Sequence, residues 1–440
     1  MYPLQHRPGH SASRRRIALA VCVLTLGLAD LAASSTTNPP PVRIARWVRS
    51  WGAAIMAAQS FDDYPGLARV YHDVTLRQLV VTTASGRNLR IWLSNEYGSR
   101  PLLIGRAHVA RSRGGPSIDA GADRELRFSG HTSVSIPPGV ALVSDPVDLE
   151  TAPGAILSIS IYLPGSTEGD VATVHEEGWR TGYVSTAGDH AAAATFPVDA
   201  ELHSYFYLSA VDVEAAGAAA IVALGDSITD GTGSTAGTDR AWPNDLARRL
   251  NAVLAGRFAV INMGIGSNRV LHSLTGPSTL QRVDRDVFAV PGVRFVIVFE
   301  GINDIADAEW LARPEEDISA DDLIGAFRQL IDRAHEHSMV VLGGTLTPTG
   351  GCQDAGFNSP ISEAKRVAVN AWIRDSGAFD AVLDFDRAIR DPANPVRLNP
   401  DYDSGDHLHP NDAGYQAMAD AIDLSVFQRN LGTDLPKPRK

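Results

Sequence analysis

The sequence predicts two halves of different architecture, an antiparallel β-sandwich or jelly roll followed by an α/β half built on a parallel sheet. From residue 46 to residue 214 the chain shows short alternating strands separated by turn clusters, a pattern typical of antiparallel sheets. From residue 219 onward, unbroken apolar runs alternate with helical patterns, which predicts strands covered by helices on both faces. A chain of 440 residues is long enough for two such domains.

Residues 1–33 predict an export signal. Three arginines at 14–16 precede the apolar run "IALAVCVLTLGLADLAA", and a basic stretch, a short apolar stretch and a small-residue exit are typical of a secretory signal of the Sec or twin-arginine type. The alternative is a membrane anchor, but the run is shorter than about 20 apolar residues and contains Asp30. We expect a secreted protein without membrane insertion, with residues 34–45 as a Pro-rich linker.

The net charge limits the classes of binding partner, and the cysteine content limits the disulfides that can form. The net charge is −12, and the body of the chain has no block of Lys or Arg, so nucleic acid and anionic membranes are poor candidate partners. Removal of the signal would leave Cys352 as the only cysteine, which excludes an internal disulfide. We expect Cys352 to be a loop thiol.

The β-half, residues 46–214, contains alternating strands such as "TLRQLVVTTAS", "NLRIWLSNE" and "AILSISIYL". In the last of these, Ser158 and Ser160 share a face with Ile156, and we expect one of the two faces of this strand to be less buried than the other. Four tryptophans could form a sugar-stacking platform or belong to the core: Trp47, Trp51, Trp92 and Trp179.

The α/β half, residues 215–440, contains five apolar runs expected as parallel strands: "AAIVALGD", "FAVIN", "VRFVIVFE", "MVVLGGT" and "FDAVLDF". Further helices are expected after Ser319, which forms a capping box with Asp322, over 359–372, and from Pro410. A helix after the first strand is predicted to bury one face made of Trp242, Leu246, Leu250, Val253 and Leu254.

Polar residues that follow these strands carry the parts needed for acyl transfer. In open parallel sheets the working site lies beyond the carboxyl ends of the strands. Ser227 follows the first strand, and Asp406 and His409 follow the last. A serine hydroxyl needs a base to become a nucleophile, histidine works as that base near neutral pH, and a carboxylate orients the histidine. Asp403 is a second candidate for the carboxylate.

Other interpretations of the same residues stay open at this point. Ser227 could simply cap the helix that follows it. Asp406, His407 and His409 in "DHLHPN" could bind a metal, which would favour a metal-dependent phosphoesterase. The Gly-x-Ser-x-Gly elbow of α/β-hydrolases is excluded because Thr229 stands at the second glycine position. Three dispersed histidines are expected to be structural or solvated: His175, His190 and His272.

Four blocks, "GDSIT", "NMGIGSN", "GIND" and "DHLHP", occur in this order, and through them residues 219–425 resemble the SGNH hydrolases, also called GDSL esterases and lipases. The resemblance implies a three-layer α/β/α, flavodoxin-like fold. It also implies that Ser227 attacks the substrate, that His409 acts as the base and that Asp406 orients His409.

The resemblance further implies an oxyanion hole. Its donors would be the N–H of Ser227, a glycine N–H from the second block and the amide of Asn303. The family's glycine falls on Ser267, with Gly266 one residue earlier, so the expected backbone donor is either of these two residues.

The two-part layout, with "LSNEYGSRPLLIGRAHVARS" ahead of the catalytic half, resembles a bacterial group of exported SGNH proteins with an N-terminal β-domain. We therefore expect a secreted serine ester hydrolase without metal or cofactor. Its substrates would be acetylated polysaccharides, short-chain lipid esters or aryl esters. The alternative from another class is a carbohydrate-binding or cell-surface protein with an inactive hydrolase half, but the intact Ser227, Asn303, Asp406 and His409 argue against it.

Overall fold

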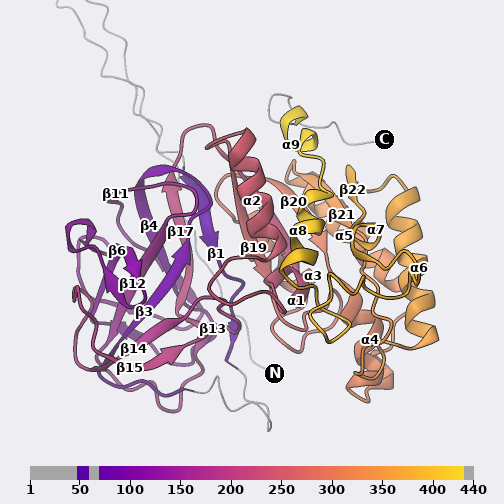
Figure 1. Cartoon of the computed structure of the whole chain (residues 1–440). Helices are drawn as coiled ribbons and strands as arrows, with labels where there is room; N and C mark the ends of the chain where they lie inside the picture. Colours follow the sequence, from indigo (N-terminus) through magenta and orange to yellow (C-terminus); the bar gives the residue numbers. More distant parts are fainter. Residues whose placement is uncertain (1–46, 59–68, 431–440) are drawn as a thin grey trace, which may run out of the picture. The chain divides into compact units, whose positions relative to one another are not determined.

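The computed structural model describes residues 47–58 and 69–430 (Figure 1). The expected signal and linker, residues 1–45, lie outside the described residues. These described residues belong to one compact unit. Among the residues that the structure describes, no helix has the length and apolar character needed to cross a bilayer.

The β-half contains two main antiparallel sheets (Figure 1). The first has the order β1-β17-β4-β10, with β11 also paired to β4. Its strands are β1 (Trp47–Gly52), β4 (Gly86–Asn95), β10 (Val140–Val143), β11 (Val147–Thr151) and β17 (Leu208–Glu214).

The second sheet has the order β15-β14-β3-β12-β6-β7, with β8 paired to β6. Its strands are β3 (Val74–Val81), β6 (Arg106–Gly114), β7 (Ser117–Ile118), β8 (Arg124–Glu125), β12 (Ile156–Leu163), β14 (Gly182–Ala187) and β15 (Val198–Leu202).

Two small antiparallel sheets complete this half, and η1 (Ala120–Ala122) follows β7. Leucine, valine and isoleucine side chains from β4 and β17 of the first sheet share one core with those from β3 and β12 of the second. The predicted antiparallel β-rich half is therefore confirmed. The small sheets are formed by β2 (Met56–Ala57), β13 (Thr173–His175) and β16 (Tyr205–Phe206), and by β5 (Leu102–Ile104) and β9 (Val134–Ile136).

One face of β12 is less buried than the other, as expected: Ile156 and Tyr162 are half-buried on the face that carries the two serines, whereas the opposite face is buried throughout. Ser158 and Ser160 are both buried. Arg77, itself buried on the neighbouring strand β3, donates from Nε to Ser160 Oγ over 2.9 Å. Its guanidinium also lies 4.3 Å from the ring centroid of Phe196. The long side chain of Arg77 covers this face. The pattern of residues within one strand cannot predict that a side chain from a neighbouring strand will cover it.

The four tryptophans do not form one platform. The guanidinium of Arg90 lies 4.5 Å from the ring centroid of Trp47 and 5.7 Å from that of Trp92, so these two rings are partly covered. Trp51 packs edge-on against Tyr205. Trp179 lines the same cavity as Trp51, with its Nε1 near Gly231 of the catalytic half.

The catalytic half has five parallel strands in the order β19-β18-β20-β21-β22 (Figure 1). This is the doubly wound order in which a ligand binds where the crossovers leave in opposite directions. That point lies between β18 and β20, next to Ser227. The strands are β18 (Ala219–Gly225), β19 (Phe258–Gly264), β20 (Val293–Phe299), β21 (Val340–Gly344) and β22 (Ala381–Leu383).

Helices cover both faces of this sheet, which confirms the three-layer prediction. Alternate residues of β18 pack with α2, α8 and α9 on one face, and with α5 and α6 on the other. The helices are α1 (Ser227–Asp230), α2 (Trp242–Val253), α3 (Thr279–Val283), α4 (Ile302–Trp310), α5 (Ala320–Glu336), α6 (Pro360–Asp375), α7 (Phe385–Ile389), α8 (Asp412–Asp420) and α9 (Ser425–Arg429), with η2 (Asp284–Phe288) and η3 (Pro314–Glu316) between them.

Helix details differ from the sequence expectations in two places. Trp242, Leu246 and Leu250 of α2 are buried, but Val253 is 60% exposed, so the predicted apolar face does not include it. Helix α4 was not among the expected helices, since "GIND" was interpreted only as a block that supplies Asn303 to the site. The capping box at the start of α5 is confirmed: Ser319 Oγ accepts from the N–H of Asp322, and the Asp322 carboxylate accepts from the N–H of Ser319.

The hydrophobic core continues from the β-half into the catalytic half. At the end of β1, a Cβ added to Gly52 would lie only 2.6 Å from the terminal methyl of Met263 and 3.0 Å from a methyl of Ile261. These contacts join β1 closely to β19. The domain boundary between residues 214 and 215 stays a prediction.

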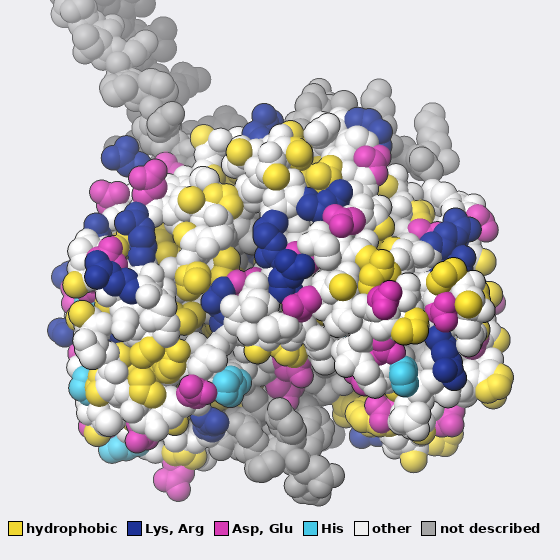
Figure 2. Space-filling model, viewed as in Figure 1, with side chains coloured by type: hydrophobic (Ala, Val, Ile, Leu, Met, Phe, Trp, Pro, Cys, Tyr) yellow, Lys and Arg dark blue, Asp and Glu magenta, His cyan; other side chains and the backbone are white. Residues whose placement is uncertain are grey.

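On the face shown in Figure 2, acidic and basic side chains are interspersed and hydrophobic side chains form small groups.

The capping box gives a test of local stability. We expect Ser319→Ala to lower the free energy of unfolding by about 1 kcal/mol, because the N–H of Asp322 loses its acceptor. Asp332→Ala, which changes an exposed residue inside the same helix, should stay within about 0.5 kcal/mol of the wild type. Urea denaturation followed by circular dichroism measures both, and equal midpoints for the two variants would contradict the assignment.

Candidate active site

Ser227 lies at the start of α1, directly after β18, and is half-buried. Asp226 caps this helix, with its carboxylate accepting from the N–H of Ile228 over 2.9 Å. Gly225 permits the tight turn, since a Cβ there would lie 2.1 Å from Thr229 Oγ1 and 2.5 Å from the carbonyl oxygen of Phe299. The capping residue is therefore Asp226, and the hydroxyl of Ser227 remains available for other contacts.

The structure brings Ser227, His409 and Asp406 together. Ser227 Oγ lies 2.9 Å from His409 Nε2 although the two residues are 182 positions apart. His409 Nδ1 lies 2.6 Å from one carboxylate oxygen of Asp406. The other oxygen of Asp406 accepts from the N–H groups of Leu408 and His409 over 2.9 and 2.8 Å. This is the geometry of a nucleophile, a base and an orienting carboxylate.

The environment keeps Asp406 ionised. Burial acts to raise the pKa of Asp406, but the hydrogen bonds from the ring and backbone of His409, together with the charge of that ring, hold the pKa well below its ordinary value. Asp403, the other candidate acid, is engaged elsewhere: its carboxylate lies 2.5 Å from His407 Nδ1. Among residues 47–58 and 69–430, no three His, Cys, Asp or Glu side chains gather as metal ligands would.

The turn after β19 carries the two backbone donors expected for the oxyanion hole. Ser267 has φ of 54°, a conformation that costs a side-chain-bearing residue about 1–2 kcal/mol and that glycine adopts freely. No described residue accepts a hydrogen bond from the N–H of Gly266 or of Ser267. The N–H of Ser227, at the first position of α1, has no acceptor within its own helix. Which residue of the turn donates stays a prediction.

Asn303 lies in the first turn of α4 and is buried. Its amide nitrogen donates to the carbonyl oxygen of Asn268 over 2.8 Å. The neighbouring Asp304 accepts from the N–H groups of Val270 and Leu271 over 2.7 and 2.9 Å. Two consecutive residues of α4 thus hold the turn after β19, and the amide of Asn303 lies at its edge.

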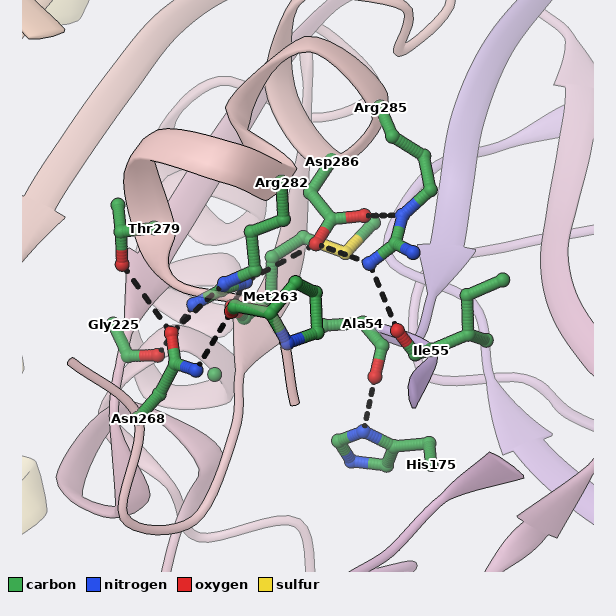
Figure 3. A network of polar contacts seen from close by, with 12 residues as sticks. Ala54, Ile55, His175, Gly225, Met263, Asn268, Thr279, Arg282, Arg285 and Asp286 are labelled. Carbon is green, nitrogen blue, oxygen red and sulfur yellow. Dashed lines mark hydrogen bonds and ion pairs between the residues drawn. The ribbon is translucent and has the colours of Figure 1, made fainter. Parts of the chain in front are cut away.

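A buried arginine fixes the two strands that carry these donors (Figure 3). Arg282 donates to the carbonyl oxygen of Gly225 over 3.0 Å, at the end of β18, and to that of Met263 over 2.7 Å, in β19. It also donates to the side-chain oxygen of Asn268 over 2.9 Å. One guanidinium therefore sets the spacing between the turn after β18 and the turn after β19, and no sequence pattern pointed to Arg282.

The same contacts reach the β-half (Figure 3). Arg282 pairs with Asp286 over 3.2 Å, and Asp286 pairs with Arg285 over 2.6 Å. Arg285 then donates to the carbonyl oxygen of Ile55 over 2.8 Å and pairs with Glu96 over 2.9 Å. The charge of Arg282 is compensated within the protein, as a buried charge requires.

Several carboxyls beneath the site are buried. Burial raises the pKa of Asp226 from 3.8 to about 7. Burial and the charge of Asp226 raise the pKa of Glu300 well above its ordinary value, and burial raises that of Asp304. Buried carboxyls shift in this direction because desolvation disfavours the charged form.

The β-half also contributes side chains next to the site. His175 at the end of β13 contacts the carbonyl oxygen of Ala54 and, over 3.2 Å, the carboxylate of Asp230 in α1. Burial alone would lower the pKa of His175, but Asp230 outweighs it and raises the pKa to about 9. Glu177 accepts from Thr232 Oγ1 over 2.9 Å. His175 was expected to be structural, and no motif pointed to Glu177, because it lies in the other half of the chain.

Cys352 is buried and free, packed in a small cluster with Ile302, Ala306, Phe357 and Leu408. His190 Nε2 contacts the carbonyl oxygen of Ala187 over 3.1 Å. Neither Cys352 nor His190 makes a hydrogen bond to Ser227, His409 or Asp406 in the described part of the chain.

Residues 223–417 match the model of the GDSL-like Lipase/Acylhydrolase family. A search of curated proteins found no match. Solved structures similar to this chain include an acetylxylan esterase from Geobacillus stearothermophilus, at 23% identity and TM-score 0.36, covering 51% of this chain and 99% of that one.

Two further similar structures are a GDSL-like lipase from Bacteroides thetaiotaomicron VPI-5482 and an alpha/beta hydrolase enzyme from the metagenome of Lake Arreo, Spain. The first has 17% identity and TM-score 0.36, covering 48% of this chain and 88% of that one. The second has 21% identity and TM-score 0.37, covering 50% of this chain and 96% of that one. Likenesses at these values carry no information about the substrate.

The raised pKa of Asp226 predicts a pH dependence of stability. Between pH 3.8 and about 7 the folded protein retains a proton on Asp226 that the unfolded chain has released, so this group makes stability fall as pH rises through that window. Asp226→Asn stays neutral and keeps the acceptor for Ile228. Relative to the wild type, we expect its free energy of unfolding to increase by about 1–3 kcal/mol between pH 5 and pH 8.

Urea denaturation at both pH values measures this change, with Asp332→Asn, an exposed site on α5, as the matched control. The assignment fails if Asp226→Asn and the control shift equally between the two pH values.

Proposed function

We propose that this protein is a carboxylic ester hydrolase that cleaves esters through a Ser227–His409–Asp406 acyl-enzyme mechanism. The match of residues 223–417 to the GDSL-like lipase/acylhydrolase family is the premise. The observation that carries the proposal is the 2.9 Å contact between Ser227 Oγ and His409 Nε2. The 2.6 Å contact between His409 Nδ1 and the Asp406 carboxylate supports it further.

In this mechanism His409 Nε2 takes the proton of Ser227 as the hydroxyl oxygen attacks the ester carbonyl carbon. Asp406 holds the ring with Nδ1–H toward its carboxylate and stabilises the imidazolium. The tetrahedral intermediate then collapses, and His409 gives the proton to the leaving alcohol. His409 then takes a proton from water as the water oxygen attacks the acyl carbon. When the bond between that carbon and Ser227 Oγ breaks, His409 returns the proton to Ser227 Oγ and the carboxylic acid is released.

The negative oxygen of the intermediate needs preorganised donors. The backbone N–H groups of Ser227 and of Gly266 or Ser267 are proposed for this role, with the amide of Asn303 as the side-chain donor. Asn303 uses one of its two amide hydrogens on the carbonyl oxygen of Asn268, and the second remains for the substrate. No step of the mechanism uses a metal or a cofactor.

The substrate is proposed to be an ester with a short acyl group, including the acetyl esters of polysaccharides. The side chain of Asp406 is 48% exposed, so this rim of the site opens to solvent, and a large alcohol part can approach from there. Export by a signal over residues 1–33 belongs to the same proposal and rests on the sequence pattern. Acetate release from a panel of acetylated polysaccharides, beside aryl esters of increasing acyl length, measures the preference.

Replacement of the nucleophile is the first test. Ser227→Ala should lower kcat for p-nitrophenyl acetate at least about 1000-fold, because no other hydroxyl is activated by His409. Ser376→Ala, at an exposed site after α6, should keep wild-type activity. Unchanged turnover in Ser227→Ala would refute the mechanism. Loss of wild-type activity with a chelator would favour the metal-dependent phosphoesterase instead.

The oxyanion donor is tested separately. Asn303→Ala should lower kcat about 100- to 1000-fold while changing KM little, because the donor acts mainly on the charge of the intermediate. Steady-state kinetics on p-nitrophenyl acetate measure the split, and far-UV circular dichroism controls for folding. A folded variant with wild-type kcat would remove Asn303 from the hole.

A further inference from the structure

Glu177 is an acidic side chain that the β-half brings to the active site. It lies in the segment after β13 (Thr173–His175) and is half-buried. Its carboxylate accepts from Thr232 Oγ1 over 2.9 Å, and the N–H of Thr232 donates to the carbonyl oxygen of Ser227 over 3.0 Å. One residue therefore connects this carboxylate to the backbone of the nucleophile.

The same carboxylate faces the turn that carries the expected oxyanion donors. A Cβ added to Gly266 would lie 3.8 Å from the carboxyl carbon of Glu177 and 3.9 Å from its Oε1. Glycine at position 266 leaves this space open between the turn and the carboxylate. Glu177 thus lies between two elements of the catalytic half, the end of α1 and the turn after β19.

The charges around Glu177 are predominantly negative. Burial raises the pKa of Glu177, and the charge of Asp230 raises it further, whereas Thr232, His175 and His409 lower it. The adjacent Glu176 has its pKa raised to about 7 by burial and by Glu177. His175 is bound to Asp230, so its positive charge is largely compensated.

The hydroxyl of Tyr415 lies among the same negative charges. It donates to the carbonyl oxygen of Thr232 over 2.5 Å. Its pKa is well above the ordinary value because of burial and the nearby carboxylates, namely Asp226, Asp230, Asp406 and Glu177. Arg397 lies near His407 and Gly351 and is exposed, so solvent screens its charge.

We propose that Glu177 is a specificity-determining residue that selects esters by charge, so that neutral and cationic esters are hydrolysed and esters with an anionic group near the scissile bond are rejected. The inference rests on the proposed function, since it assumes attack by Ser227. Like charges disfavour binding by an amount set by their separation and by the local dielectric. The β-half supplies this selection, and the catalytic half supplies the chemistry.

The test uses three matched aryl acetates: 4-acetoxybenzoate, its neutral methyl ester, and the 4-acetoxyphenyl trimethylammonium cation. They share the scissile bond and differ in the charge at the far end of the ring. At pH 8 we expect Glu177→Gln to raise the ratio of kcat/KM for the anionic over the neutral ester about five- to tenfold relative to wild type. Comparison of enzymes on the same pair cancels the intrinsic reactivity of each ester and the charge of Arg397.

Two further variants distinguish an effect of the negative charge of Glu177 from an effect of its hydrogen bond to Thr232. Thr232→Val removes the hydrogen bond and keeps the carboxylate, and Glu336→Gln neutralises an exposed carboxylate at the end of α5, before the amino end of β21. Both should keep the wild-type ratio. A purely structural clamp predicts that Thr232→Val and Glu177→Gln behave alike on all three esters.

The outcomes are distinct. Hydrolysis of the neutral ester with an unchanged charge ratio in Glu177→Gln overturns the inference and leaves the proposed function intact. Failure of the wild type to hydrolyse the neutral ester refutes the proposed function, and the inference falls with it. If Glu177→Gln does not fold, the wild-type series decides: equal kcat/KM for the anionic and cationic esters, after division by their alkaline hydrolysis rates, overturns the inference.

Discussion

The hydrogen bond between Ser227 and His409 is the contact on which the arrangement of the catalytic half depends. The two residues are 182 positions apart, and their side-chain atoms lie 2.9 Å from each other. Such a contact forms only if the carboxyl end of β18 and the segment before α8 are held at one edge of the sheet. The parallel order with a crossover on each side of β18 provides that edge, and the apolar layers on both faces of the sheet keep it rigid.

Buried polar groups then adjust the geometry at this edge. Arg282 binds the carbonyl oxygens of Gly225 and Met263, so the ends of β18 and β19 cannot separate without leaving a buried guanidinium unpaired. A charge in this position is stable only when its partner stays in place, and Asp286 is that partner. The pair of Asp286 with Arg285 extends the arrangement to the β-half, and this couples the order of the site to the packing of the two halves.

The sequence predicted the features that depend on local pattern. Alternating and unbroken apolar runs distinguished the two kinds of sheet, and the capping box at Ser319 was confirmed. The four blocks pointed to Ser227, Asp406 and His409, which the structure brings together. Features that depend on contacts between distant segments were missed: Arg77 covering Ser160, Arg282 joining two strands, and Glu177 entering from the other half. No periodicity within one segment encodes them, since each depends on where a second segment lies.

The most direct test of the account is to trap the covalent intermediate. The protein is mixed with p-nitrophenyl acetate, quenched in acid within the first turnover, digested and analysed by peptide mass spectrometry, with Ser227→Ala treated in parallel. The account predicts one added acetyl group on the peptide that contains Ser227 in the wild type and none on that peptide in the variant. Hydrolysis that proceeds with the acetyl group on another residue, or equally fast in Ser227→Ala, would contradict it.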